Sequence, residues 1–150
     1  MKIILFTQSF YTGGAEKISV NLANYYITQN YEVVIYVLIN DGPLKKILNK
    51  KIKVFIINKS LIKSFFLIFN IVSITNNDIY IYCDRDISLL SLPIRFKAFL
   101  SLKKIRNIVR EANLQNNANN INNIFFRSIY KLFIFILMGI HTDIIANSND

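Results

Sequence analysis

Hydrophobic and polar positions follow two periods along the chain. Short, nearly continuous apolar runs rich in β-branched and aromatic residues predict buried strands, and apolar residues spaced three or four apart predict helices. The predicted strands are Lys2–Thr7, Glu32–Leu38, Lys53–Ile57, Asp78–Cys83, Ile105–Arg110 and Asp143–Asn147. The predicted helices begin at Ala15 and then cover Leu44–Asn49, Leu61–Thr75, Ile87–Leu102 and Phe125–Ile140, with Pro93 expected to bend or break the helix around it.

Strands that alternate with helices predict an α/β fold, a Rossmann-like doubly wound parallel sheet with helices on both faces. In such sheets ligands bind at the carboxyl ends of the strands. Residues 113–123 are rich in Asn and are expected to form a loop. The loops in which we look for function are therefore Gln8–Gly14, Asp84–Asp86, Arg110–Asn117 and Asn147–Asp150.

The composition excludes several classes of protein. With 150 residues the chain is expected to form one domain, and 53% hydrophobic residues are too many for a disordered chain. A single Cys excludes an internal disulfide framework and a Cys-rich zinc site. The first apolar segment, Met1–Thr7, is too short for a signal peptide, so a cytoplasmic location is the default expectation.

Two apolar stretches raise the question of a membrane. Lys63 and Asn70 interrupt Leu61–Ile74, and Leu132–Ile140 is a run of only nine residues. Both are shorter than the roughly 20 residues that cross a bilayer. The apolar residues of Phe125–Ile140 keep helical spacing and favour core packing; the neighbouring Arg127 and Lys131 leave attachment to a membrane surface open.

The net charge of +9 favours anionic partners such as phosphorylated ligands, acidic lipids or nucleic acid. No pattern of a known nucleic-acid module is present, so we do not expect nucleic acid as a partner. The loop after the first strand contains Gly13 and Gly14, followed by a helix whose amino end favours a phosphate. The alternative is a tight turn that needs glycine, with Thr12 as the helix cap and Glu16 compensating the helix dipole.

Asp84-Arg85-Asp86 follows the fourth strand. Two carboxylates at this spacing can hold a divalent metal, but Asp86 also fits a helix N-cap and Asp84 a cleft or a solvated loop, so no metal is expected. We interpret Cys83 as a small buried hydrophobic residue and His141 as a helix-end or surface residue.

The segment Ser-Phe-Tyr-Thr-Gly-Gly-Ala-Glu-Lys (residues 9–17) is followed by Val20-Asn21-Leu22-Ala23. In order and spacing it resembles the opening of glycosyltransferase family 4, in which a strand, a Gly-Gly-Ala-Glu-Arg/Lys loop and a helix follow one another. The stretches Ile108–Asn113 and Asp143–Ser148 are similar to later strands of that family. The resemblance covers the whole chain and is strongest over residues 2–25. It implies the two-domain GT-B architecture and metal-independent sugar transfer that retains configuration.

The resemblance also implies roles for individual residues. Gly13 and Gly14 would face the diphosphate of a nucleotide-sugar, which is the donor substrate, and no cofactor is implied. Glu111 and Asp84 would be the catalytic-site residues that position the acceptor, together with Asn113. Arg85 or Arg110 would attract negative charge on the acceptor. Members of the family often carry a His near these strand ends, whereas the only His of this chain is His141.

Residues 1–150 would thus correspond to the amino-terminal, acceptor-side domain, with the donor-binding carboxy-terminal domain expected beyond residue 150. We expect part of a hexosyltransferase that moves a sugar to a glycan or lipid-linked acceptor in cell-surface polysaccharide or glycoconjugate synthesis. We expect these residues alone to be inactive, and the location to be cytoplasmic, with peripheral attachment to the inner face of the membrane left open. Two other hypotheses remain: a non-catalytic acceptor-binding subunit that recruits a separate donor-binding chain, and a membrane-surface binding protein.

Overall fold

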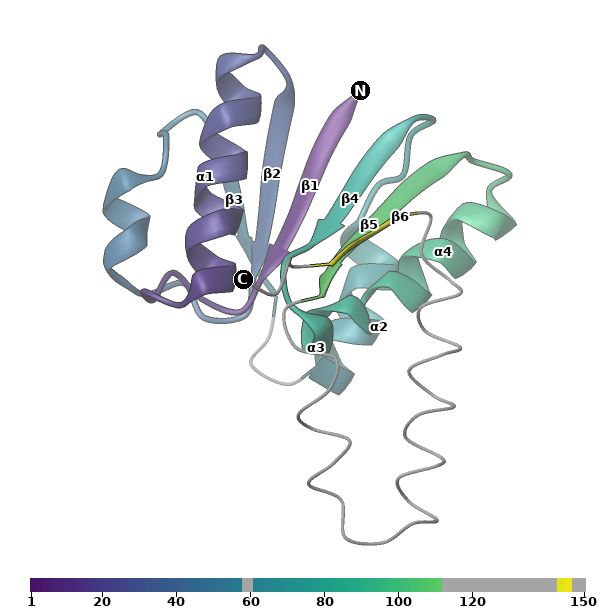
Figure 1. Cartoon of the computed structure of the whole chain (residues 1–150). Helices are drawn as coiled ribbons and strands as arrows, with labels where there is room; N and C mark the ends of the chain where they lie inside the picture. Colours follow the sequence, from purple (N-terminus) through teal and green to yellow (C-terminus); the bar gives the residue numbers. More distant parts are fainter. Residues whose placement is uncertain (58–60, 112–142, 147–150) are drawn as a thin grey trace, which may run out of the picture.

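A parallel sheet with helices on both faces forms the centre of the molecule (Figure 1). The computed structural model describes residues 1–57, 61–111 and 143–146. Six strands of these residues pair in parallel. They are β1 (Lys2–Thr7), β2 (Glu32–Val37), β3 (Lys53–Ile56), β4 (Asp78–Tyr82), β5 (Ile105–Glu111) and β6 (Asp143–Ala146).

The strand order is β3-β2-β1-β4-β5-β6. The chain starts in the middle of the sheet, builds outward to β3, and then returns past β1 to build the other half from β4. This is the order of a doubly wound, Rossmann-like sheet, so the predicted fold class is confirmed. The reversal of winding direction lies between β1 and β4.

The helices form two layers, one on each face (Figure 1). On one face lie α1 (Gly14–Thr28) and the 3₁₀ helix η1 (Pro43–Ile47); on the other lie α2 (Leu61–Ile71), α3 (Arg85–Ser88) and α4 (Ser91–Leu100). Alternate residues of each strand enter opposite cores, because successive side chains of a strand point to opposite faces. Ile3, Leu5, Val20 and Ala23 belong to the core under α1, and Ile4, Phe6, Ile68 and Ile94 to the core under α2 and α4.

A row of aromatic rings crosses the sheet under the second helix layer. Phe6 is in register with Tyr36 and Tyr82, and Tyr36 is in register with Phe55. The ring centroids are 5.4, 5.3 and 4.9 Å apart from Phe55 through Tyr36 and Phe6 to Tyr82, and each pair is stacked. Because such cross-strand pairs each stabilise a sheet by about 0.2–1 kcal/mol, this row helps to fix the register of four strands.

The helix ends differ from the sequence predictions. The predicted helix Leu61–Thr75 ends at Ile71, where the Lys97 ammonium donates hydrogen bonds to the carbonyl oxygens of Phe69 and Val72. The predicted helix Ile87–Leu102 is divided into α3 and α4. Pro93 lies in the first turn of α4, where its missing N–H costs no helix bond, so the expected break is confirmed.

The short helix predicted over Leu44–Asn49 is present as a 3₁₀ helix, Pro43–Ile47. The expectation that Asp86 is a helix N-cap was wrong, because α3 begins at Arg85 and Asp86 is its second residue. The predicted loop 113–123 and the predicted helix Phe125–Ile140 lie outside the described residues. Among the residues that the structure does describe, no helix is long and apolar enough to cross a membrane.

Candidate functional site

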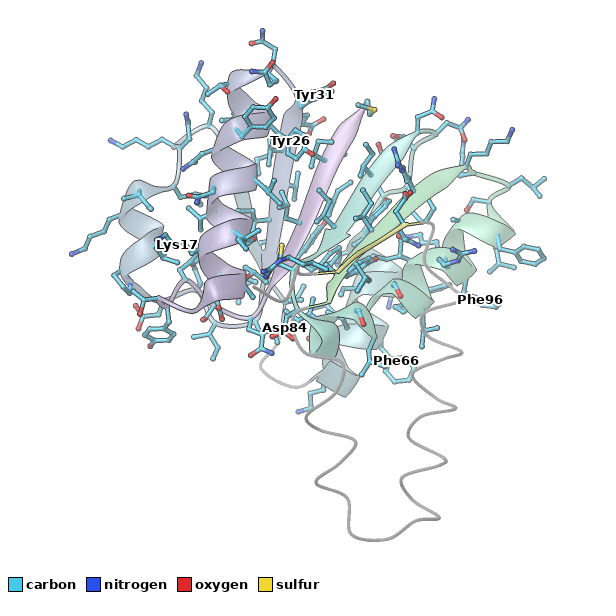
Figure 2. The ribbon with its side chains drawn as sticks, viewed as in Figure 1. Lys17, Tyr26, Tyr31, Phe66, Asp84 and Phe96 are labelled. Carbon is cyan, nitrogen blue, oxygen red and sulfur yellow. The ribbon has the colours of Figure 1, made fainter. Side chains whose placement is uncertain are left out.

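The carboxyl ends of β1 and β4 meet at the point where the winding of the sheet reverses. In doubly wound sheets this is where a crevice forms and ligands bind. Gln8 follows β1 directly, and Asp84 comes two residues after the end of β4. The Gln8 side-chain amide donates a hydrogen bond to the Asp84 carboxylate, Nε2 to Oδ2, at 2.9 Å. Two of the loops singled out from the sequence are therefore joined across the switch point, with Asp84 half-buried beside the start of α1 (Figure 2).

The loop between β1 and α1 is fixed by its buried residue Phe10, which is hydrogen-bonded to the segment after β2. Phe10 is fully buried, its N–H donates to the Asp41 carbonyl at 2.9 Å, and its carbonyl accepts the Leu44 N–H at 3.0 Å. Gly42, with φ +130°, lies so close that a Cβ there would be 2.1 Å from the Phe10 carbonyl carbon. The Asp41 carboxylate also accepts a hydrogen bond from the Tyr11 hydroxyl at 3.0 Å, which raises the pKa of that phenol. The segment after β2 therefore sets the path of the loop.

Gly13 and Gly14 stand at the amino end of α1, as expected, but not in a conformation that requires glycine. Gly13 is the N-cap, with φ −66° and ψ 156°, which any residue adopts; Thr12 is therefore not the cap. A Cβ on Gly14 would meet nothing within 4 Å. The absence of a side chain at Gly14 leaves the amino end of the helix open to solvent and to a ligand.

Glu16 occupies part of the space in front of this helix end. Its carboxylate accepts a hydrogen bond from the Ser9 hydroxyl at 3.3 Å, and its Oε2 lies 2.1 Å from where a Cβ of Gly13 would be. The negative charge thus compensates the positive end of the helix, as predicted from its place in the first turn. An anionic ligand at the same helix end would have to displace this carboxylate.

Cys83, the residue before Asp84, and Arg110 lie on the same face of the sheet. Burial raises the pKa of the Cys83 thiol to about 11, while the nearby Ser19 hydroxyl and the positive charge of Arg110 act in the opposite direction. Cys83 is 1% exposed, which confirms the interpretation as a small buried hydrophobic residue. Arg110 is half-buried near the end of β5, the strand next to β4, and its positive charge acts on the Cys83 thiol.

The structure brings together only some of the site residues that the sequence predicts. The loop with Gly13 and Gly14, Asp84 and Arg110 all lie at the carboxyl edge of β1, β4 and β5. Glu111 is the last residue of β5, and Arg85 opens α3, but the side chains of these two residues and of Asp86 are not described. Asn113 and His141 lie outside the described residues. Within the described part of the chain, no group of three metal-ligating side chains could hold a metal ion.

The sequence singled out the loop Gln8–Gly14 but assigned no role to Gln8 or Ser9, and it assigned none to the Asp41–Gly42 turn. Gln8 is the polar residue that ends the first apolar run, which is a weak signal that it stands at the edge of the sheet. Asn40-Asp41-Gly42-Pro43 is visible in the sequence as a chain break. Its contact with Phe10 depends on the pairing of β1 with β2 and leaves no local signal.

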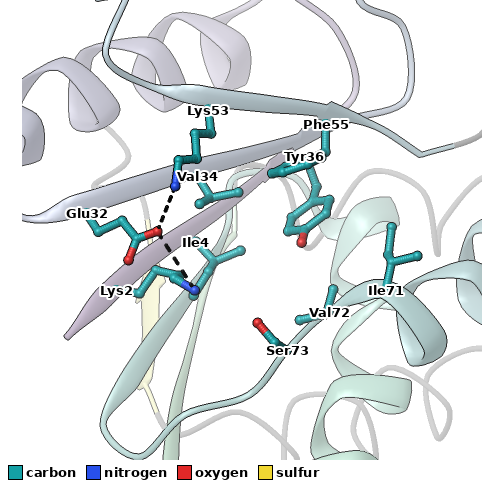
Figure 3. A pocket seen from close by; sticks show the side chains of 10 residues that line it. All are labelled: Lys2, Ile4, Glu32, Val34, Tyr36, Lys53, Phe55, Ile71, Val72 and Ser73. Atoms are coloured by element: carbon teal, nitrogen blue, oxygen red, sulfur yellow. Dashed lines mark hydrogen bonds and ion pairs between the residues drawn. The ribbon is translucent and has the colours of Figure 1, made fainter.

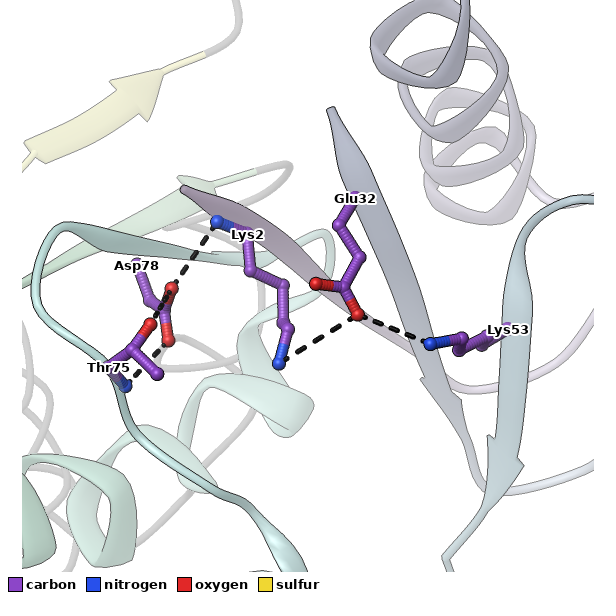
Figure 4. A network of polar contacts seen from close by, with 5 residues as sticks. All are labelled: Lys2, Glu32, Lys53, Thr75 and Asp78. Carbon is purple, nitrogen blue, oxygen red and sulfur yellow. Dashed lines mark hydrogen bonds and ion pairs between the residues drawn. The ribbon is translucent and has the colours of Figure 1, made fainter. Parts of the chain in front are cut away.

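A groove of about 200 Å³ lies at the opposite, amino end of the sheet (Figure 3). Ile4, Val34, Tyr36 and Phe55 line it from the strands, and Ile71, Val72 and Ser73 from the end of α2. At its rim the Glu32 carboxylate lies 3.3 Å from the Lys53 ammonium and 4.0 Å from that of Lys2 (Figure 4). Since these residues begin their strands, the groove is separate from the site predicted at the carboxyl ends.

A buried carboxylate next to this groove ties β1 to β4. Asp78 is fully buried and accepts hydrogen bonds from the Thr75 N–H at 2.9 Å, the Thr75 hydroxyl at 2.7 Å and the Lys2 N–H at 3.3 Å (Figure 4). The charge is therefore satisfied by donors of the protein itself, and a structural role accounts for it.

Comparisons of the chain with protein-family models, with curated proteins and with solved structures gave no match.

Proposed function

We propose that the chain is the amino-terminal, acceptor-side domain of a retaining glycosyltransferase of GT-B architecture. It would contribute one wall of a cleft in which a sugar passes from a nucleotide-sugar to a glycan or lipid-linked acceptor. The observation that carries the proposal is the junction of the Gly13-Gly14 loop with Asp84, through Gln8, at the switch point of a Rossmann-like sheet. The resemblance to family 4, strongest over residues 2–25, supports it independently.

The proposed roles follow the chemistry available at this edge. The open amino end of α1 at Gly14 would take the donor diphosphate, because its N–H groups and dipole favour an anion. Asp84, oriented by Gln8, would position an acceptor hydroxyl, and Arg110 or Arg85 would attract negative charge on the acceptor. Glu111 and Asn113 complete the proposed acceptor side on the strength of the resemblance. Such a site acts by positioning and electrostatics.

Glu16 gives this proposal a sharp test, because its carboxylate and a diphosphate would compete for the same helix end. Binding of UDP- and GDP-sugars to the purified chain can be followed by saturation-transfer NMR and by ³¹P chemical shifts. We expect Glu16→Gln to bind the diphosphate more tightly, by about two- to tenfold, since a repelling charge is removed. Gly14→Val should weaken binding, and Gly14→Ala is the matched control, because its methyl group meets no atom within 4 Å.

The outcomes separate the hypotheses. Binding that responds to Gly14→Val and Glu16→Gln as stated would support the donor-side role. Binding of a glycan acceptor without any nucleotide-sugar response would favour an acceptor-binding subunit. If Gly14→Val and Gly14→Ala bind equally well, the diphosphate role of the loop is wrong.

A further inference from the structure

The outer side of α2 and α4 carries large apolar side chains in contact with solvent. Phe66 is 66% exposed on α2, and Phe96 and Phe99 are 58% and 75% exposed on α4. Leu100, at the end of α4, and Leu102, just beyond it, are 60% and 90% exposed. We call these five residues the α2–α4 surface. Figure 2 shows Phe66 and Phe96 on the helix layer, beyond the sheet.

The two helices pack against each other and together carry this surface. The Lys97 ammonium of α4 donates to the Phe69 and Val72 carbonyls of α2 at 2.8 and 2.7 Å. The same ammonium lies 5.8 Å from the centre of the Phe69 ring, and this ring is 6.1 Å from that of Phe96. The Lys97 ammonium is therefore engaged between α2 and α4, and it joins the two helices that carry the exposed aromatic residues.

The charged side chains of α2, of α4 and of the turn after α4 are all positive. Lys63 on α2, Arg95 on α4, and Lys103 and Lys104 after α4 are all exposed. The sequence contains no Asp or Glu from residue 42 to residue 77 or from residue 87 to residue 110. Both helices and the turn after α4 therefore combine exposed apolar side chains with cations only.

Leu102 supplies an independent observation. The Lys103 N–H donates to the Ala98 carbonyl and the Leu102 N–H to the Phe99 carbonyl, so α4 ends in a Schellman motif. Leu102 holds the position of that motif where glycine is usual, with φ +52°. A leucine is strained in this conformation, and at 90% exposure its side chain gains almost nothing from the described part of the fold. A strained residue that presents an apolar side chain to solvent points to a contact outside the chain.

We propose that the α2–α4 surface docks on an anionic lipid bilayer. Phe99, Leu100 and Leu102 enter the boundary between headgroups and acyl chains, and Lys103 and Lys104 lie at the level of the lipid phosphates. A bilayer fits better than nucleic acid because the most exposed side chain of the surface, Leu102 at 90%, is aliphatic, and neither Leu102 nor Leu100 offers a ring for stacking on bases. The inference rests on these contacts and charges and does not depend on the proposed sugar transfer.

The test is co-sedimentation of the full chain with phosphatidylglycerol-rich vesicles and with pure phosphatidylcholine vesicles. We expect binding to the anionic vesicles only. Binding should weaken when salt is raised from about 0.1 M to about 1 M, since the Debye length falls from about 10 Å to about 3 Å. Leu102→Gly and Phe99→Ser should each weaken binding by about tenfold, because each removes apolar surface that the bilayer would bury.

Two controls separate docking from folding. Ile47→Ser removes an apolar residue that is 57% exposed and lies beside Lys45 and Lys46 on the other side of the sheet, so binding should not change. Leu102→Gly should unfold at a higher urea concentration than wild type while binding vesicles less well. A merely structural role for Leu102 would move both measurements in the same direction.

Three results would overturn the proposal: equal binding to neutral and anionic vesicles, unchanged binding of both Leu102→Gly and Phe99→Ser, or an equal loss with Ile47→Ser. Sedimentation without vesicles and anisotropy of a labelled single-stranded RNA complete the experiment. Self-association or RNA binding that these substitutions abolish, while vesicle binding persists unchanged, would assign the surface to a second copy of the chain or to nucleic acid instead.

Discussion

Replacement of Gly42 by alanine should strongly destabilise the fold. Gly42 has φ +130° and ψ 158°, a conformation that is essentially limited to glycine. An added Cβ would lie 2.1 Å from the Phe10 carbonyl carbon, 2.2 Å from its oxygen and 2.4 Å from the Tyr11 nitrogen. All three contacts are with backbone, so no side-chain rotation relieves them, and the loop before α1 must move.

The expected cost has two parts. The backbone strain is about 1–3 kcal/mol. Displacement of the loop also weakens the bonds from the Phe10 N–H to the Asp41 carbonyl and from the Leu44 N–H to the Phe10 carbonyl. Each is worth about 0.5–1.5 kcal/mol, which brings the loss to about 2–6 kcal/mol. Against a total stability of about 5–15 kcal/mol, this is a large fraction.

Urea unfolding followed by circular dichroism measures this loss. The midpoint of Gly42→Ala should fall by about 2 M for an m value of about 2 kcal/mol/M. Gly14→Ala is the matched control, since its Cβ meets no atom within 4 Å, and it should stay within about 0.5 kcal/mol of wild type. If Gly42→Ala unfolds within about 1 kcal/mol of wild type, the reasoning about the Phe10 contact is refuted.

Three further substitutions probe other parts of the fold. Asp78→Ala removes the acceptor of three hydrogen bonds in a fully buried position and should destabilise the protein by about 3 kcal/mol. Asp41→Ala removes an exposed carboxylate and should cost less. The urea midpoints of the two variants are compared, and an equal fall in both would contradict this prediction. Leu102→Gly relieves a positive φ and should raise the free energy of unfolding by about 1 kcal/mol, and a lower midpoint would contradict the strain argument. The Cys83 thiol has its pKa raised from 9.0 to about 11 in the folded state, so the unfolded chain loses its proton first. The contribution of the protonated thiol to stability is therefore complete below pH 9 and is lost between about pH 9 and pH 11, by roughly 2–3 kcal/mol. Cys83→Ala should remove this part of the dependence of the unfolding free energy on pH. If that dependence is unchanged in Cys83→Ala, the thiol is not its source.

Short-range patterning accounts for the strands. All six begin at the predicted residue and end within one residue of the prediction, because each is an apolar run bounded by a polar residue or a turn. The alternation with helices then determined the fold class, since parallel strands need helical crossovers that cover both faces. The helix ends were less predictable. Leu61–Ile71 stops where Lys97, a residue of another helix, binds its last carbonyls.

At the candidate site too, local sequence patterns predicted some features, and contacts between distant residues decided the others. Parallel strands align their carboxyl ends, so the sequence alone placed the Gly13-Gly14 loop, Asp84 and Arg110 at one edge of a sheet. The strand order β3-β2-β1-β4-β5-β6 was needed to show that β1 and β4 are neighbours and that Gln8 bonds Asp84. Likewise, only the fold brings Gly42 against Phe10 and folds Glu16 over the start of α1. Elements are determined by residues near one another in the chain, whereas these contacts join residues that become neighbours only when the sheet closes and its helices pack.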